Sequence, residues 1–325
     1  MPNIPIFNTF ADNSLDRSGN FRKNPEWISS QMHNPKAKFI PMFNLMVPIQ
    51  KQKNFTNIKY CNLSEISNYL DNPLNSIFLG TKKSVPYFAS DISKSNIVEN
   101  LNNKIVFEEL RKAAMFLSNE DASMLALARS MTEWKLNNKY CPKCGHKTEP
   151  LSGGNAIICK NKICKKEIFP RTDPVVIMLV YHKDKCVLGR QQYFPKNFFS
   201  ILAGFMEPGE SIESAVCREV LEEISINIKN VTYHSSQPWP YPSSLMIGCI
   251  AEAEDTNIII DEDEIVEAKW VERKLILSGL SLAKNSKTDP LKESNLNDNK
   301  LILPPPIAIA HQLLKHWTDN PKFFP

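Results

Sequence analysis

Four cysteines near the middle of the chain limit the possible fold more than any other feature. Cys141 and Cys144 form a C-x2-C pair, 14 residues separate Cys144 from Cys159, and four more separate Cys159 from Cys164. Thiolates at this spacing are typical of two short loops that bind one tetrahedral zinc ion. All four ligands would come from the protein, so the pattern predicts a structural zinc ribbon. The alternative, four unrelated buried thiols, explains the clustering less well, and we expect His146 to be solvated.

Composition and charge exclude several classes of protein. The chain has 325 residues, of which 42% are hydrophobic and 23% charged, and this balance excludes wholesale disorder. Its net charge of +4 is too small to imply a duplex-binding domain. No apolar run approaches the roughly 20 residues that span a bilayer, so we expect no association with a membrane. With no secretory leader, the cytoplasm is the default location, and the peroxisome and the mitochondrion remain alternatives.

Shifts in composition divide the chain into three predicted domains, residues 1–135, 136–168 and 169–325. In the first, residues 77–89 are typical of a β-hairpin, and Ser118 is a plausible N-cap of a helix. The second is the cysteine-rich segment. In the third, the apolar run Val175–Val180 predicts a buried strand, and residues 211–224 predict one strong helix. Strands and helices in this order indicate an α+β protein.

Three glutamates on the predicted helix indicate a cation site. Glu219, Glu222 and Glu223 stand at positions i, i+3 and i+4, so their side chains project from one side of a helix. Carboxylates this close repel one another, and a hard divalent cation such as Mg²⁺ or Mn²⁺ relieves that repulsion. The alternative is a solvated acidic face, which is common on surface helices. We expect Arg218 to point elsewhere on the helix and to pair with Glu210.

The sequence around this helix resembles the Nudix box, G-x5-E-x7-R-E-U-x-E-E-x-G-U, where U is aliphatic. Ser225, in place of glycine, is the one departure and should cost about 1 kcal/mol. The resemblance implies a Nudix α/β/α sandwich with a mixed sheet and hydrolysis of a nucleoside diphosphate linked to another moiety. It also implies that Glu219, Glu223 and the carbonyl of Ala203 bind Mg²⁺ or Mn²⁺, with Glu222 as a further ligand or base. The matching residues are Gly204, Glu210, Arg218, Glu219, Val220, Glu222, Glu223 and Ile226.

A second motif narrows the resemblance. Ser236–Ser244 is a proline-stiffened loop with two aromatic residues, suited either to stacking on a planar ring or to packing on the core. It resembles the S-Q-P-W-P-F-P-x-S signature of the NADH pyrophosphatase branch of Nudix hydrolases, with Tyr241 in place of Phe. The resemblance implies substrate contacts from Gln237, Pro238, Trp239, Pro240, Tyr241, Pro242, Ser243 and Ser244.

The rest of the chain is similar to the same branch. Its members have an N-terminal Nudix-like α/β domain, a four-cysteine zinc ribbon and then the catalytic Nudix domain. The resemblance implies that Glu264 is an additional metal ligand and that Phe169 and Ala310 contact the substrate. It also implies that Phe205 packs on the substrate across the interface of a homodimer.

We therefore expect an NAD(H) diphosphatase that produces AMP and nicotinamide mononucleotide and also removes NAD caps from RNA. Its catalytic residues would be Glu219, Glu222, Glu223 and Glu264. One alternative is a Nudix hydrolase of ADP-ribose or dinucleoside polyphosphates. A second is an inactive zinc-ribbon protein that binds RNA.

Overall fold

The computed structural model describes residues 8–52, 55–70, 72–94, 105–285, 300–320 and 323, which fall into two compact units. The first unit comprises Asp173–Pro238, Ser244–Pro325 and the start of the chain as far as Ala11. The second comprises Asp12–Thr172 and Trp239–Ser243. Both segments expected to precede the catalytic domain lie in the second unit, and the boundary between them stays a prediction.

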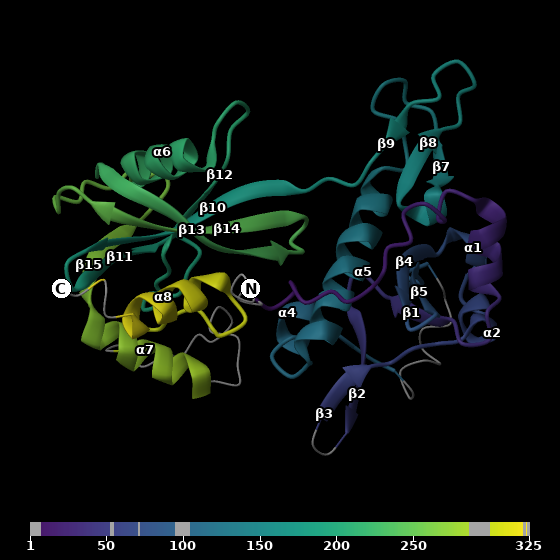
Figure 1. The fold of residues 1–325 in the computed structure, drawn as a ribbon, viewed down its shortest axis with the longest axis horizontal. Helices are drawn as coiled ribbons and strands as arrows, with labels where there is room; N and C mark the ends of the chain where they lie inside the picture. Colours follow the sequence, from purple (N-terminus) through teal and green to yellow (C-terminus); the bar gives the residue numbers. More distant parts are fainter. Residues whose placement is uncertain are drawn as a thin grey trace. The chain divides into compact units, whose positions relative to one another are not determined.

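A six-stranded mixed sheet forms the centre of the first unit (Figure 1). Its strands are β10 (Asp173–His182), β11 (Lys185–Arg190), β12 (Leu202–Phe205), β13 (Ile228–Trp239), β14 (Ser244–Ala253) and β15 (Glu267–Glu272). β14 pairs with β10 in parallel, whereas β11 and β12 pair with β10 antiparallel. β15 flanks β11, and β13 flanks β14.

Helices cover both faces of this sheet: α6 (Ile212–Ile224) on one, α7 (Arg273–Asn285) and α8 (Ile309–Asp319) on the other (Figure 1). The alternation of β10 explains the two layers, because successive side chains of a strand point to opposite faces. Val176 and Met178 pack into the core beneath α6. Ile177 and Leu179 pack into the core formed with α7 and α8. The expected α+β class with a mixed sheet is confirmed.

The second unit begins with small sheets and short helices. β1, β5 and β4 form one sheet, and β3, β2 and β6 form another. The predicted hairpin is present as β4 and β5, and Ser118 caps α5 by accepting a hydrogen bond from the Asp121 N–H at 3.1 Å. The elements are α1 (Pro25–Met32), β1 (Lys38–Met42), β2 (Val47–Gln52), β3 (Phe55–Ile58), α2 (Leu63–Ser67), η1 (Pro73–Asn75), β4 (Ile77–Lys82), β5 (Val85–Asp91), β6 (Val106–Glu108), α4 (Leu110–Ala113) and α5 (Asn119–Asn137).

The cysteine-rich segment folds into its own three-stranded antiparallel sheet within the second unit. The sheet consists of β7 (Thr148–Leu151), β8 (Ala156–Cys159) and β9 (Glu167–Ile168), with the 3-10 turn η2 (Ser152–Gly154) between β7 and β8. Thr148 lies opposite Cys159 in the register, so the two cysteine loops meet at one end of the sheet. Across the part of the chain that the structure describes, no helix is long and apolar enough to cross a membrane.

Candidate active site

The helix α6 positions two carboxylates that are almost completely buried. Its N-terminus is capped by the hydroxyl of Ser211, which accepts a hydrogen bond from the Ser214 N–H at 3.2 Å. Its apolar face packs on the sheet, and this packing carries Glu219 and Glu223, one turn apart, to sites where they are 7% and 4% exposed. The helix ends at Ser225 in the left-handed conformation, at φ 57°, as expected from its position in the motif.

Glu264 joins these two glutamates. One carboxylate oxygen from each of Glu219, Glu223 and Glu264 lies within 4.8 Å of the others. Glu264 is exposed and belongs to the loop before β15. Burial, followed by the charges of Glu219, Glu264 and Glu222, raises the pKa of Glu223 to about 8. Because Oε2 of Glu223 is buried with no hydrogen-bond partner, the cluster has the chemistry of a site for a hard divalent cation.

Glu222 lies apart from this cluster. Its side chain is half exposed, and its Oε2 accepts a hydrogen bond from Arg218 Nη1 at 2.8 Å. The structure thus brings together two of the three glutamates expected from the helix, with Glu264 as the third member. The roles of Glu222 as metal ligand or base stay predictions.

Arg218 connects the loop before α6 to the glutamates of the helix. It donates hydrogen bonds to both carboxylate oxygens of Glu210, at 2.6 and 2.9 Å, so the expected pair is confirmed. The expectation that Arg218 points away from the other glutamates is wrong. The guanidinium also donates to Glu219 at 2.9 Å and to the carbonyl of Phe205 at 2.9 Å, because its planar fork has five donors. This arginine lowers the pKa of Glu210 to about 2.

A glycine makes room for the carboxylate of Glu219. Gly204 lies in β12 opposite Val176, and a Cβ atom at this position would be 1.9 Å from Cδ of Glu219. Any side chain at residue 204 would therefore displace that carboxylate. The neighbouring Ala203 is partly buried and Phe205 is 61% exposed. Their expected contacts with a cation and with a substrate stay predictions.

The beginning of the proline-rich loop, in the first unit, is fixed by buried hydrogen bonds. Gln237 is 1% exposed, and its Nε2 donates to the carbonyls of Thr9 and Ile307, both at 2.8 Å. Its Oε1 accepts from the Ile309 N–H at 2.8 Å, at the start of α8. Ala310, in the same helix, is 3% exposed. Sequence reasoning gave both residues a role with substrate and missed the structural role of Gln237, which local sequence does not signal.

The rest of this loop, Trp239–Ser243, belongs to the second unit. Tyr241 donates a hydrogen bond to Glu109 at 2.7 Å, and its ring lies 4.5 Å below the guanidinium of Arg129. Arg129 also donates to the carbonyl of Pro240. Glu109 and Arg129 were not expected from the sequence, because more than a hundred residues separate them from the loop. Elsewhere in this unit, Phe169 is 63% exposed.

The four cysteines form a compact cluster. One sulfur from each lies within 4.8 Å of the others, and Cys141–Cys164 and Cys144–Cys159 are 3.9 and 3.4 Å apart. A tetrahedral ion about 2.3 Å from each sulfur needs sulfur–sulfur distances of about 3.8 Å, close to those observed. The backbone N–H of His146 lowers the pKa of Cys144 to about 6, which favours a thiolate. The His146 side chain is exposed, as expected. The residues fit a four-thiolate metal site.

Two family models match the chain. Residues 171–291 match the NUDIX domain, and residues 37–134 match the NADH pyrophosphatase-like rudimentary NUDIX domain. The two matched ranges flank the four-cysteine segment.

Characterised proteins resemble nearly the whole chain. The NAD-capped RNA hydrolase NUDT12 of Homo sapiens is 35% identical over 351 residues, covering 95% of this chain and 73% of that protein. The NAD-capped RNA hydrolase NPY1 of Saccharomyces cerevisiae is 35% identical, with coverages of 74% and 67%. The mitochondrial NAD(P)H pyrophosphatase NUDT13 of Mus musculus is also 35% identical, with coverages of 73% and 66%. The chain therefore belongs to the Nudix hydrolase family, in the branch that joins a Nudix domain to an NADH pyrophosphatase-like rudimentary Nudix domain.

Proposed function

We propose that this protein is a cation-dependent diphosphatase that hydrolyses NADH or NAD⁺ to AMP and nicotinamide mononucleotide and also removes NAD caps from RNA. The observation that carries the proposal is the cluster of Glu219, Glu223 and Glu264, with Glu219 lying over Gly204. The relatives named as NAD-capped RNA hydrolases and NAD(P)H pyrophosphatases support the choice of substrate.

The carboxylates have separate proposed roles. Glu219, Glu223 and Glu264, with the carbonyl of Ala203, would hold Mg²⁺ or Mn²⁺. Such an ion neutralises pyrophosphate charge and lowers the pKa of a water molecule. Hydrolysis then adds the water oxygen to one phosphorus, breaks its bond to the bridging oxygen and leaves one proton to be accepted. Glu264 is the better candidate for that base, because Arg218 holds Glu222, whereas no ion pair involves Glu264 among the described residues.

The substrate contacts extend this proposal to both units. In the first, Phe205, Gln237, Pro238, Ser244 and Ala310 are the proposed contacts. In the second, they are Phe169 and the loop Trp239–Ser243. Aromatic rings at Phe169, Trp239 and Tyr241 would stack on the nicotinamide or adenine ring and orient the scissile bond. The homodimer in which Phe205 would contact the substrate, and the cytoplasmic location, are part of the same proposal.

The main test compares glutamine variants of the helix glutamates. Glu219→Gln and Glu223→Gln should each lower kcat/KM on NADH by at least about a hundredfold, because each removes a charged ligand. Glu222→Gln is the matched control on the same helix and should have a smaller effect. Unfolding temperatures recorded alongside should stay close to that of the wild type. Turnover of both ligand variants within about twofold of the wild type would overturn the metal assignment.

A competition between substrates tests the choice of NAD(H). Initial rates on NADH, NAD⁺, ADP-ribose and a short NAD-capped RNA should favour the nicotinamide-containing substrates. Preference for ADP-ribose would support the alternative Nudix activity. Tight RNA binding without release of AMP would instead support an inactive RNA-binding protein.

We also propose that Cys141, Cys144, Cys159 and Cys164 hold one structural Zn²⁺. Binding energy at such a site contributes directly to folding, so Cys141→Ser should lower the unfolding temperature and the zinc content together. Cys217→Ser is a suitable control, because that thiol is exposed and outside the cluster. An unfolding temperature that strong chelation leaves unchanged would contradict the structural metal.

A further inference from the structure

The positive charge of the chain is concentrated in the segment that carries the four cysteines. Residues 139–171 contain seven lysines and one arginine but only two glutamates, a net charge of +6. Because the whole chain has a net charge of +4, the remaining residues together carry a net charge of −2. The excess of positive charge over the whole chain therefore comes from this one small sheet and its loops.

The fold places these lysines around the cysteine end of the small sheet. The Lys160 N–H donates to the carbonyl of Lys147 at 3.0 Å, and the Cys159 N–H donates to the carbonyl of Lys166 at 3.0 Å. Lys147, Lys160 and Lys166 therefore lie on neighbouring strands. Further lysines occupy the two cysteine loops and the approach to the first. We call the seven together the basic end: Lys139, Lys143, Lys147, Lys160, Lys162, Lys165 and Lys166.

The basic end is exposed and largely without internal ion pairs. All seven lysine side chains are exposed. Lys160 approaches Glu149 at 3.4 Å, and within the described residues no other ion pair involves these lysines. Lysines that only solubilise a surface are usually mixed with carboxylates, whereas unpaired lysines on one face form a field that attracts a polyanion.

An exposed aromatic residue accompanies the charge. Tyr140 is 60% exposed and forms a β-bridge with Lys147. Single-stranded nucleic acid is bound by this combination, in which cations follow the phosphates and aromatic rings stack on bases. An anionic lipid surface would use the charge but not the planar ring.

We propose that the basic end binds the RNA chain that follows an NAD cap, as a single strand and without sequence preference. The inference rests on the proposed function for its substrate. It assigns the cysteine-rich segment a second role besides folding, namely to favour capped RNA over the free dinucleotide. Free NADH, which lacks the RNA chain, would not use this surface.

A first experiment measures RNA binding by the full-length wild-type protein. A fluorescent, uncapped oligouridine should bind with an affinity that falls as KCl rises. Contacts from four to seven lysines predict a slope of log K against log[KCl] of about −3 to −5. A slope weaker than about −1 would overturn the proposal, because it leaves no room for several phosphate contacts. This measurement requires no variant and does not depend on catalysis.

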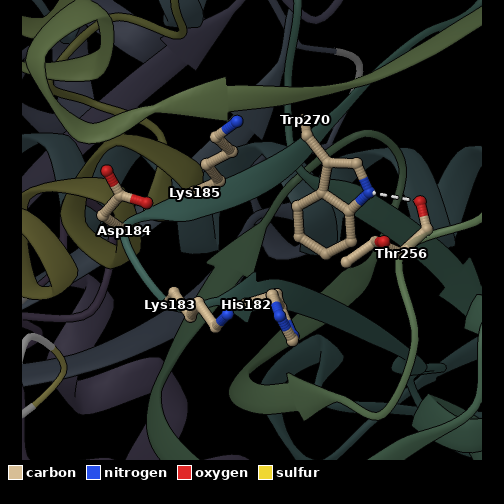
Figure 2. Close-up of a pocket in the computed structure, with 6 residues that line it drawn as sticks. All are labelled: His182, Lys183, Asp184, Lys185, Thr256 and Trp270. Atoms are coloured by element: carbon tan, nitrogen blue, oxygen red, sulfur yellow. Dashed lines mark hydrogen bonds between the residues drawn. The ribbon is translucent and has the colours of Figure 1, made fainter.

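A matched pair of triple variants locates the surface. The test variant carries Lys143→Gln, Lys162→Gln and Lys166→Gln. The control carries Lys183→Gln, Lys185→Gln and Lys274→Gln, three exposed lysines of the first unit. Figure 2 shows Lys183 and Lys185 beside a pocket that also contains Asp184, so the charge there is mixed. Both variants lose the same net charge.

The test variant should weaken the salt slope by about 2 and lower kcat/KM on NAD-capped RNA by about tenfold or more at low salt. Its kcat/KM on NADH should stay within about twofold of the wild type. Equal losses on both substrates, or the same losses in the control, would overturn the proposal. So would binding of phosphatidylserine vesicles that the test variant loses while its RNA affinity is unchanged.

Folding and catalysis are checked separately. Unfolding temperature and zinc content show whether the test variant is intact. If it is not, Tyr140→Ala serves instead, and it should lower RNA affinity severalfold while leaving the salt slope unchanged. An unchanged affinity in that variant would overturn the stacking part of the proposal. If the wild type hydrolyses neither NADH nor capped RNA yet binds RNA through the basic end, the proposed function fails and the RNA surface stands.

Discussion

The buried glutamates of α6 are maintained at the expense of folding stability. Glu219 has one charged partner, Arg218, whereas Oε2 of Glu223 has no hydrogen-bond partner. A buried carboxylate without a donor or a cation destabilises a folded protein, and its pKa rises accordingly. A residue whose native environment penalises its charge indicates that an ion is meant to bind there.

At the residue scale, Gly204→Ala should remove activity with little effect on the remainder of the fold. The new methyl group would overlap Glu219, since the Cβ position is 1.9 Å from its Cδ. We expect kcat/KM on NADH to fall at least about a hundredfold and the affinity for Mn²⁺ to fall with it. Gly19→Ala is the control, because nothing lies within 4 Å of a Cβ atom there. Mn²⁺ affinity equal to that of the wild type would contradict the close approach.

A buried histidine should make stability depend on pH. Nδ1 of His234 is 2.8 Å from the Ser235 hydroxyl, and its ring centroid is 4.5 Å from that of His316. Burial, and then the charge of His316, lowers the pKa of His234 to about 4. Between its unfolded pKa of about 6.5 and pH 4, the unfolded state binds more protons, so stability falls as pH falls. Urea unfolding at pH 7.5 and pH 5 should show a smaller loss for His234→Gln than for the wild type, and equal losses would contradict this assignment.

Among the elements, α8 depends on a residue far away in the sequence. Ala308 at its N-cap makes no side-chain hydrogen bond to the helix, and Gln237 satisfies the Ile309 N–H instead. This explains why a loop residue with an expected substrate role is buried. The same amide holds the carbonyl of Thr9, so one side chain joins three segments of the first unit.

Gln237→Ala should lower the free energy of unfolding by about 2–4 kcal/mol, because three buried hydrogen bonds are lost and their partners are left unsatisfied. Gln312→Ala, on α8 itself, loses a single hydrogen bond to Pro306 and should cost about 1 kcal/mol. Urea denaturation of both variants gives the comparison. If the two variants are equally stable, Gln237 does not cap the helix.

The end of α6 offers a stabilising change. Ser225 has φ 57° and ψ 30°, a conformation that glycine adopts with less strain. Ser225→Gly should raise the free energy of unfolding by up to about 1 kcal/mol. Denaturant titration checks this, and a decrease in stability would mean that Ser225 makes a compensating contact.

Elements set by local patterns were predictable, whereas long-range partnerships were not. The hairpin at β4 and β5, the Ser118 and Ser211 caps and the Arg218–Glu210 pair all follow from residues close together in the sequence. The exclusion of Glu222 from the cluster depends on the competing hydrogen bond from Arg218. The contacts of Gln237 with α8 and of Tyr241 with Glu109 join segments whose proximity only the tertiary fold creates.

At the scale of the whole molecule, the chain changes units after Ala11, Thr172, Pro238 and Ser243. The first segment is tied into the first unit by buried hydrogen bonds, including Asn8 Nδ2 to the Ser235 hydroxyl at 3.0 Å. The five residues Trp239–Ser243 are held in the second unit through Tyr241 and Pro240.

This threading governs how deletion data should be read. A shortened gene that begins at residue 173 would discard Asn8 and Thr9 together with everything that grips Tyr241. Loss of turnover in such a fragment would therefore say little about whether the rudimentary half participates in chemistry. Point changes in the intact polypeptide are the sounder way to divide labour between the halves.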